Sequence, residues 1–153
     1  MIGLNEFPSL HPLVIHFPIV LLIIVVFFQI SAILMKQKLL DIIIIYLLIG
    51  GFIGALVAST ILHPHLKGLD TQIQNTLINH EFFAYSTIWI SGTALILKAL
   101  NYYVFNKAFW IELLVSILIL GCSVSVSIAG HYGAQLVYIE GIGPKGNQLD
   151  IRK

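Results

Sequence analysis

The stretch LHPLVIHFPIVLLIIVVFFQISAILM, residues 10–35, decides the fold class of this chain. From Leu13 to Met35 it contains no Asp, Glu, Lys or Arg, and a helix of about 20 apolar residues is enough to cross the hydrocarbon core of a bilayer. The residues do not alternate between polar and apolar, as they would in a strand of a membrane barrel. A helix is then the structure that satisfies the backbone hydrogen bonds in lipid. The stretch therefore predicts a transmembrane helix.

The composition of the whole chain extends this prediction to an integral membrane protein. Of its 153 residues, 58% are hydrophobic and 10% are charged, whereas an average soluble domain has roughly 25% charged residues. The net charge of +1 gives no reason to expect nucleic-acid binding. The single cysteine, Cys122, excludes an intrachain disulfide and a cysteine-based metal motif. Three more apolar segments are long enough to span a membrane, at about residues 42–62, 82–104 and 108–129.

Short connections between the predicted spans favour one arrangement of the helices. Because short loops join antiparallel neighbours, we expect an all-α, up-down-up-down four-helix bundle, with residues 1–153 forming a single domain. Only the middle connection, residues 63–80, is long and polar. Gly50 and Gly54 have the spacing of closely packed helix pairs. The glycine-rich residues 130–153 are interpreted as a cap at the end of the bundle, either a turn or short hairpin or an interfacial tail.

Lysines mark one end of the predicted bundle, which we call the lysine end: Lys36, Lys38, Lys98 and Lys107. Lys98 falls inside a span, and we expect its side chain to extend toward the nearer interface. Asp41 and Glu112 lie at the same end, where they complement the dipoles of two helix N-termini. By the positive-inside rule the lysine end faces the cytoplasm, so that both termini of a bacterial inner-membrane protein would be periplasmic.

Histidines mark the opposite end, which we call the histidine end: His11, His16, His63, His65, His80 and His131. His16 lies about 7.5 Å deeper than His11 at the helical rise, and an ionisable residue inside a span is a functional candidate. Pro18 removes a backbone donor two residues later. Either Ser9 caps a helix that kinks near Pro18, or the regular helix begins at Pro18. Both alternatives direct His16 toward the interior.

Histidines that project from facing helices are how bundles hold haem and metal ions. A b-type haem needs two axial imidazoles on opposite faces of the porphyrin. Diagonal helices supply opposed ligands, which gives His16 with His80 as the first pair and His63 with His131 as the second. The remaining candidates would line the pocket or bond to the ligands: His11, Ser125, Ser127 and Gly130. The cluster thus predicts haem b near the outer face, relaying electrons to a membrane or periplasmic partner.

Two alternatives to haem stay open at the same cluster. A zinc or copper ion would need three or four converging ligands, to which His63, His65 and Glu81 could contribute. In the other alternative the chain binds no cofactor and is an accessory or scaffold subunit of a larger membrane complex. The sequence contains no nucleophile elbow, P-loop or paired intramembrane carboxylate. An electron carrier or accessory subunit is therefore favoured over a stand-alone enzyme.

Three motifs of the chain match the pattern of a known family. They are HPLVIHFPIVLL (residues 11–22), His80 before the third span, and GHYGAQLVYIEGIG (residues 130–143). On these motifs the chain resembles the DUF2231 family of small four-helix bacterial membrane proteins, with mild departures at Ala134 and Ile142. The resemblance carries over His11, His16, His80 and His131, and it leaves His63 and His65 without a matching family position. Members are often joined to or encoded near cytochrome c or Rieske modules, so the resemblance implies electron transfer with other redox or membrane-complex subunits.

Overall fold

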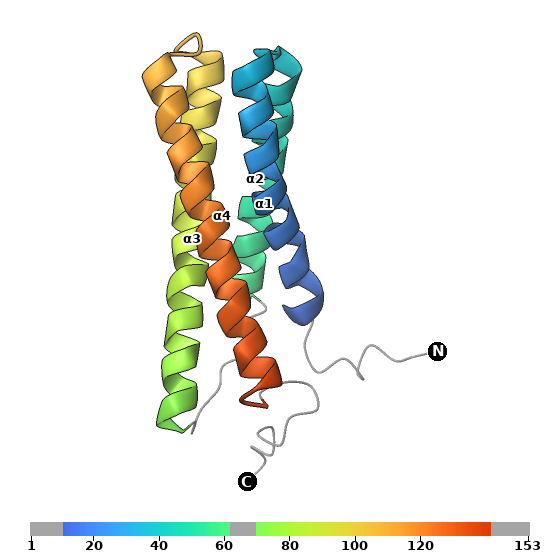
Figure 1. The fold of residues 1–153 in the computed structure, drawn as a ribbon, viewed down its shortest axis with the longest axis vertical. Helices are drawn as coiled ribbons and strands as arrows, with labels where there is room; N and C mark the ends of the chain where they lie inside the picture. The colour runs from blue at the N-terminus through green and yellow to red at the C-terminus, as the bar shows by residue number, and fades with distance from the viewer. Residues whose placement is uncertain (1–10, 62–69, 142–153) are drawn as a thin grey trace, which may run out of the picture.

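The computed structural model describes residues 11–61 and 70–141, and every regular element in these ranges is helical. The elements are α1 (His11–Met35), α2 (Lys38–Leu56), which continues into a π-helical turn η2 (Val57–Ile61), α3 (Thr71–Tyr103) and α4 (Phe109–Tyr138). The four α-helices lie side by side in one bundle (Figure 1). Each of them is long and apolar enough to cross a membrane. The predicted all-α bundle of membrane-spanning helices is confirmed.

The helices alternate in direction around the bundle (Figure 1). α1 packs against α2 and α4, and α3 packs against the same two helices, so that α1 and α3 are diagonal partners. At the lysine end, a turn after Met35 joins α1 to α2 and a turn at residues 104–108 joins α3 to α4. Lys36 (φ 52°), Asn106 (φ 47°) and Lys107 (φ 62°) adopt the left-handed conformation in these turns. The chain is thus two antiparallel hairpins, α1–α2 and α3–α4, packed against each other.

α3 is longer than the hydrophobic segment predicted from the sequence. It begins at Thr71 and not at residue 82, and the side chain of Asp70 accepts a hydrogen bond from Thr71 N at 2.8 Å. The added turns belong to the connection predicted as a loop, so that prediction is wrong for residues 71–80. Ile73 is buried and Leu77 is partly buried, and both pack with Leu136 of α4. One apolar side on a mostly polar segment is enough to keep it helical.

α4 is also longer than predicted. It continues through residues 130–138 and ends at Tyr138, so the turn or hairpin predicted for the cap is wrong over these residues. The rest of the predicted cap, residues 142–153, lies outside the described part of the chain, as do His63 and His65. α3 and α4 extend beyond α1 and α2 at the lower end of Figure 1, which is the histidine end.

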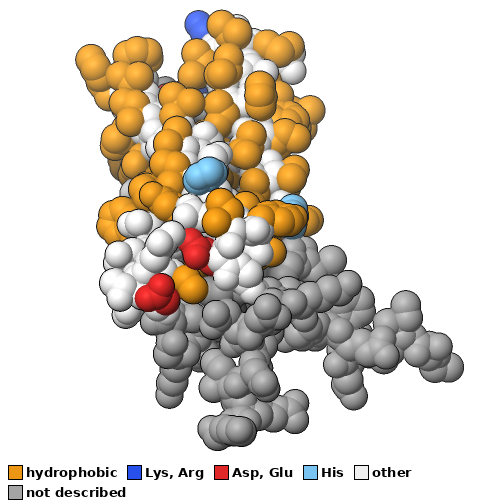
Figure 2. All heavy atoms as spheres, turned by 60° about the horizontal axis from the view of Figure 1, so that its bottom comes forward, with side chains coloured by type: hydrophobic (Ala, Val, Ile, Leu, Met, Phe, Trp, Pro, Cys, Tyr) orange, Lys and Arg blue, Asp and Glu red, His pale blue; other side chains and the backbone are white. Residues whose placement is uncertain are grey.

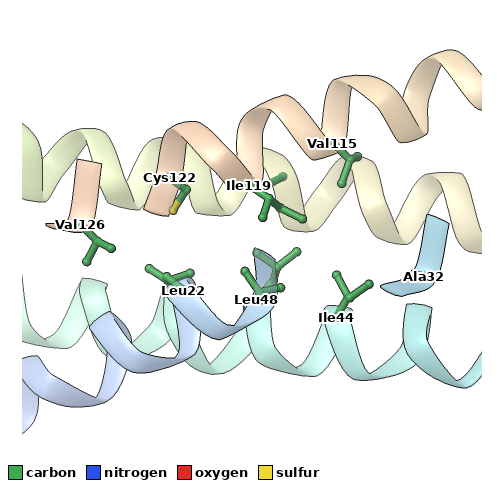
Figure 3. Packing of buried hydrophobic residues seen from close by; sticks show 10 residues of the cluster. Leu22, Ala32, Ile44, Leu48, Val115, Ile119, Cys122 and Val126 are labelled. Atoms are coloured by element: carbon green, nitrogen blue, oxygen red, sulfur yellow. The ribbon is translucent and has the colours of Figure 1, made fainter. Parts of the chain in front are cut away.

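The core lies between the two hairpins, and its close-up view shows side chains of opposite helices meeting along the axis (Figure 3). Within α1–α2, glycines set the helix separation. A Cβ atom at Gly50 would lie 2.8 Å from Leu21 Cδ1, and one at Gly51 would lie 2.5 Å from Leu22 Cδ2. A Cβ atom at Gly54 would lie 3.2 Å from Pro18 Cδ, so the close packing predicted for Gly50 and Gly54 is confirmed, and Gly51 adds to it. The buried residues of the core are Leu22, Val25, Ala32, Ile44, Leu48, Ala94, Val115, Ile119, Cys122 and Val126.

The outer surface of the bundle is apolar along its length. Large hydrophobic side chains such as Phe27, Leu34 and Trp89 are exposed. Figure 2 shows hydrophobic side chains covering the sides of the bundle, with histidine side chains among them. A surface of this kind is unfavourable in water and is matched by lipid.

Candidate functional site

Pro18, which follows His16 by two residues, lies inside a continuous helix. α1 runs from His11 to Met35 without interruption, so the alternative in which the helix begins at Pro18 is wrong. The proline ring is buried against α2, where a Cβ atom at Gly54 would lie 3.2 Å from Pro18 Cδ. Gly54 therefore leaves the space that the ring fills. This contact fixes which side of α1 faces α2.

The rotation of α1 that buries Pro18 places His16 on the outside of the bundle. His16 precedes Pro18 by two residues, which is about 200° around a helix of 3.6 residues per turn. The side chain of His16 is accordingly exposed. The prediction that a bend near Pro18 aims His16 into the interior is wrong, and the diagonal pair of His16 with His80 across the core fails with it.

His80 of α3 is turned toward α4. Its Nδ1 is 2.8 Å from the backbone oxygen of Ala129, and a carbonyl oxygen only accepts, so Nδ1 carries the proton and donates. A Cβ atom at Gly133 would lie 3.3 Å from His80 Cε1, so this glycine makes room for the ring. The bond fixes the orientation of the ring. This is the arrangement by which a ligating histidine is commonly held.

His131 of α4 points away from His80. It follows Ala129 by two residues, again about 200° around the helix, and its side chain is exposed. It does, however, lie at a depth close to that of His16. α1 and α4 meet where a Cβ atom at Gly130 would lie 3.6 Å from Ile19 Cδ1. From that level His16 lies about 4.5 Å and His131 about 1.5 Å toward the histidine end, so the two residues differ by about 3 Å in depth.

The predicted pocket-lining residues make hydrogen bonds to the backbone. Ser125 Oγ is buried and donates to Phe83 O at 3.0 Å, and Thr87 Oγ1 donates to Ser125 Oγ at 3.1 Å. Ser127 Oγ is exposed and donates to Ser123 O within its own helix. The two bonds of Ser125 hold α3 against α4, as polar side chains do in membrane bundles. Gly130 contacts α1, and His11 has no described side chain.

A metal site of the zinc or copper kind needs several converging ligands. Within residues 11–61 and 70–141, no group of three or more His, Cys, Asp and Glu side chains is placed to hold a metal ion. His63 and His65, the additional ligands considered from the sequence, lie outside these ranges.

The lysine end holds a polar cluster that the sequence interpretation missed. Lys98 does not extend to the interface: its side chain is 1% exposed, and Nζ donates to Asp41 Oδ1 at 2.9 Å and to Glu112 Oε1 at 2.5 Å. Lys107, in the turn before α4, pairs with the other oxygen of Asp41. Asp41 and Glu112 do lie in the first turns of α2 and α4, as predicted. They also form a buried ion-pair network, which joins the two hairpins.

Three uncharged polar side chains complete this network around Glu112. Gln29 Nε2 donates to Glu112 Oε1 at 2.7 Å and to Ser116 Oγ at 2.9 Å, and Asn101 Nδ2 donates to Glu112 Oε2 at 2.8 Å. The amide oxygens Gln29 Oε1 and Asn101 Oδ1 are buried without a hydrogen-bond partner. Gln29 and Lys98 are the sequence signal for this cluster, because both are polar residues inside apolar spans.

Fold and polar networks together define the class of this protein. Four apolar helices, an apolar outer surface and a buried ion pair between Lys98 and Asp41 are the features of an integral membrane helix bundle. The family model described as "Predicted membrane protein (DUF2231)" matches residues 8–146, and the chain belongs to this family. Comparison with curated proteins and with solved structures gives no match.

Proposed function

We propose that this membrane protein transfers electrons through a b-type haem bound at the histidine end, where His16 and His131 would hold it. The observation that carries the proposal is the position of these two residues. They lie on the adjoining helices α1 and α4, at nearly equal depth, and both side chains are exposed. Two axial imidazoles must reach one iron from opposite faces, so their helices have to present them at matching depth.

The outer side of the seam between α1 and α4 suits such a group better than the bundle interior. The interior is occupied by packed side chains, of which Leu22 is fully buried and Val126 nearly so. A haem bound on the seam would be shielded by lipid or by a partner subunit, and it would supply one-electron exchange. His80 is then a positioning residue, because its bond to Ala129 O holds α3 against the segment of α4 that carries His131.

The test is a reduced-minus-oxidised visible spectrum of the protein purified in detergent from haem-replete cells. We expect b-type bands that are lost in His16→Ala and in His131→Ala and retained in His80→Gln, the matched control. Loss in His80→Gln with retention in His131→Ala would contradict the pairing. A colourless preparation would contradict haem binding altogether.

The second candidate is an accessory subunit of a larger membrane complex that holds no cofactor of its own. Exposure of both His16 and His131 favours it, because imidazoles on the outer surface can bond to a neighbouring subunit. Chemical cross-linking in native membranes separates the candidates. A defined partner cross-linked to the α1–α4 seam of a colourless protein would support this second function.

We propose further that the lysine end faces the cytoplasm of a bacterial inner membrane and that both termini are periplasmic. Lys36 and Lys38 are exposed at the turn between α1 and α2, and Lys107 is exposed at the other turn. Basic residues at short turns set orientation. Lys98 does not count toward this orientation rule, because its charge is paired with carboxylates inside the bundle. Labelling of single cysteines introduced at Lys38 with a membrane-impermeant reagent should fail in intact spheroplasts and succeed in inverted vesicles.

A further inference from the structure

The network at the lysine end is balanced in charge. Two carboxylates, Asp41 and Glu112, face two ammonium groups, Lys98 and Lys107. The uncharged side chains that bond to the Glu112 carboxylate are Gln29 of α1 and Asn101 of α3, and Gln29 also donates to Ser116 Oγ of α4. Balance matters here because an unpaired charge removed from water is strongly unfavourable.

One of the four charged groups, the ammonium group of Lys107, can leave the network without disturbing the helices. The side chain of Lys107 is 38% exposed, whereas that of Lys98 is 1% exposed. Lys107 belongs to the turn at residues 104–108, outside the candidate spans, so its ammonium group can move from Asp41 into water by side-chain rotation alone. The buried remainder, Lys98 with Asp41 and Glu112, would then have one negative charge in excess.

Glu112 is surrounded by groups that can hold it with or without a proton. Gln29 donates to its Oε1 and Asn101 donates to its Oε2, while the carbonyl oxygen of each amide has no partner. A side-chain amide presents two donors on one side and an acceptor on the other. If Glu112 is protonated on Oε2, a half-turn of the Asn101 amide brings Oδ1 into position to accept from the new O–H group. In the described part of the chain, the side chains that bond to Asp41 are those of Lys98 and Lys107, and neither is an amide.

We propose that Glu112 is a proton-binding site at the lysine end, and that a proton enters when Lys107 withdraws from Asp41. The exchange conserves charge: one ammonium group leaves the network and one proton arrives. The proton forms an O–H bond on Glu112 Oε2, that group donates to Asn101 Oδ1, and Lys98 keeps Asp41 as its partner. The site is independent of the haem proposed at the histidine end.

The test is infrared spectroscopy of the protein in lipid nanodiscs at neutral pH, which reports the C=O stretch of protonated carboxyl groups. Lys107→Ala removes the mobile ammonium permanently, so we expect one more protonated carboxyl per chain than in wild type. Lys107→Arg keeps the charge and should match wild type. The extra band should disappear in Lys107→Ala/Glu112→Gln. It should also disappear in Lys107→Ala/Asp41→Asn, because removal of both Lys107 and Asp41 restores the balance between Lys98 and Glu112.

Two results would overturn the proposal. One is the absence of an extra band in folded Lys107→Ala, as judged by circular dichroism. The other is an extra band in Lys107→Ala that survives in Lys107→Ala/Glu112→Gln, because the proton would then not be on Glu112. If Lys107→Ala does not fold, wild-type protein is acidified in the presence of a lipid-soluble carbodiimide, which attacks protonated carboxyl groups. Mass spectrometry should then find the adduct on Glu112, and an adduct on Asp41 alone would contradict the assignment.

Discussion

The sharpest prediction on the fold concerns Gly51, at the closest approach of α1 and α2. In Gly51→Ala the new Cβ atom would lie 2.5 Å from Leu22 Cδ2 and 2.7 Å from Leu22 Cγ. Leu22 is 0% exposed and belongs to the central core. The clash involves the branch point of its side chain, so rotation of a terminal methyl group does not relieve it. Either α1 and α2 separate or Leu22 moves into its core neighbours.

The size of the effect follows from two opposing contributions. Adding a methylene to a packed core costs about 1–3 kcal/mol, and replacing glycine by alanine inside a helix returns about 0.8–1 kcal/mol. We therefore expect Gly51→Ala to lower the free energy of unfolding by about 0–2 kcal/mol. Gly121→Ala is the matched control, because a Cβ atom there meets nothing within 4 Å. It should be neutral or stabilising by up to about 1 kcal/mol.

The assay is reversible unfolding in mixed micelles, followed by circular dichroism, for wild type and both variants. Gly50→Ala gives an intermediate case, because its Cβ atom would meet only Leu21 Cδ1, the flexible end of a side chain, at 2.8 Å. The expected order of stability is Gly121→Ala, then Gly50→Ala, then Gly51→Ala. If Gly51→Ala is as stable as Gly121→Ala, the packing of α1 on α2 is not as close as the structure has it.

Three further outcomes follow from the structure. Lys98→Met leaves the carboxylates of Asp41 and Glu112 without their shared counter-charge and should lower the free energy of unfolding by about 3–5 kcal/mol. In the same micelle assay, Lys98→Met/Glu112→Gln should recover most of this loss. Ser125→Ala removes the bond to Phe83 O and should lower the free energy of unfolding by about 0.6 kcal/mol, the usual value for such bonds in membrane bundles. A loss above about 2 kcal/mol would mean that Ser125 does more than join α3 to α4. Gly133→Ala brings a Cβ atom to 3.3 Å from His80 Cε1. It should shift the NMR signals of the His80 ring without unfolding the protein, and an unchanged His80 spectrum would contradict the contact.

The helices could be predicted from the sequence because their cause is local. A run without charges such as residues 13–35 has no stable state in lipid other than a helix. The ends of the helices are harder to predict from the sequence, because they depend on contacts between distant residues. Residues 71–80 are mostly polar and read as a loop, and they are helical since Ile73 and Leu77 find Leu136 on the neighbouring helix. Hydrophobicity marks the part of a helix that lies in lipid and does not mark where the helix begins.

The side on which a residue lies could not be predicted for the same reason. The sequence indicates that His16 is deep in the first span, but the rotation of α1 is set by the contact of Pro18 with Gly54. That contact joins two helices and turns His16 outward. Lys98 shows the converse case. Its partner Asp41 is 57 positions away, so only the tertiary arrangement reveals that the lysine is neutralised in the interior.

The two ends of the bundle differ in how the hairpins are joined, and this bears on where the protein can open. The side-chain hydrogen bonds that link described residues of one hairpin to described residues of the other lie at the lysine end, where Gln29 reaches Glu112 and Lys98 reaches Asp41. Toward the histidine end, α1 and α4 meet through apolar contact such as Ile19 with Gly130. In the described part of the chain, the polar ties that resist opening of the two hairpins are therefore at the lysine end, where Gln29 and Lys98 each reach the opposite hairpin.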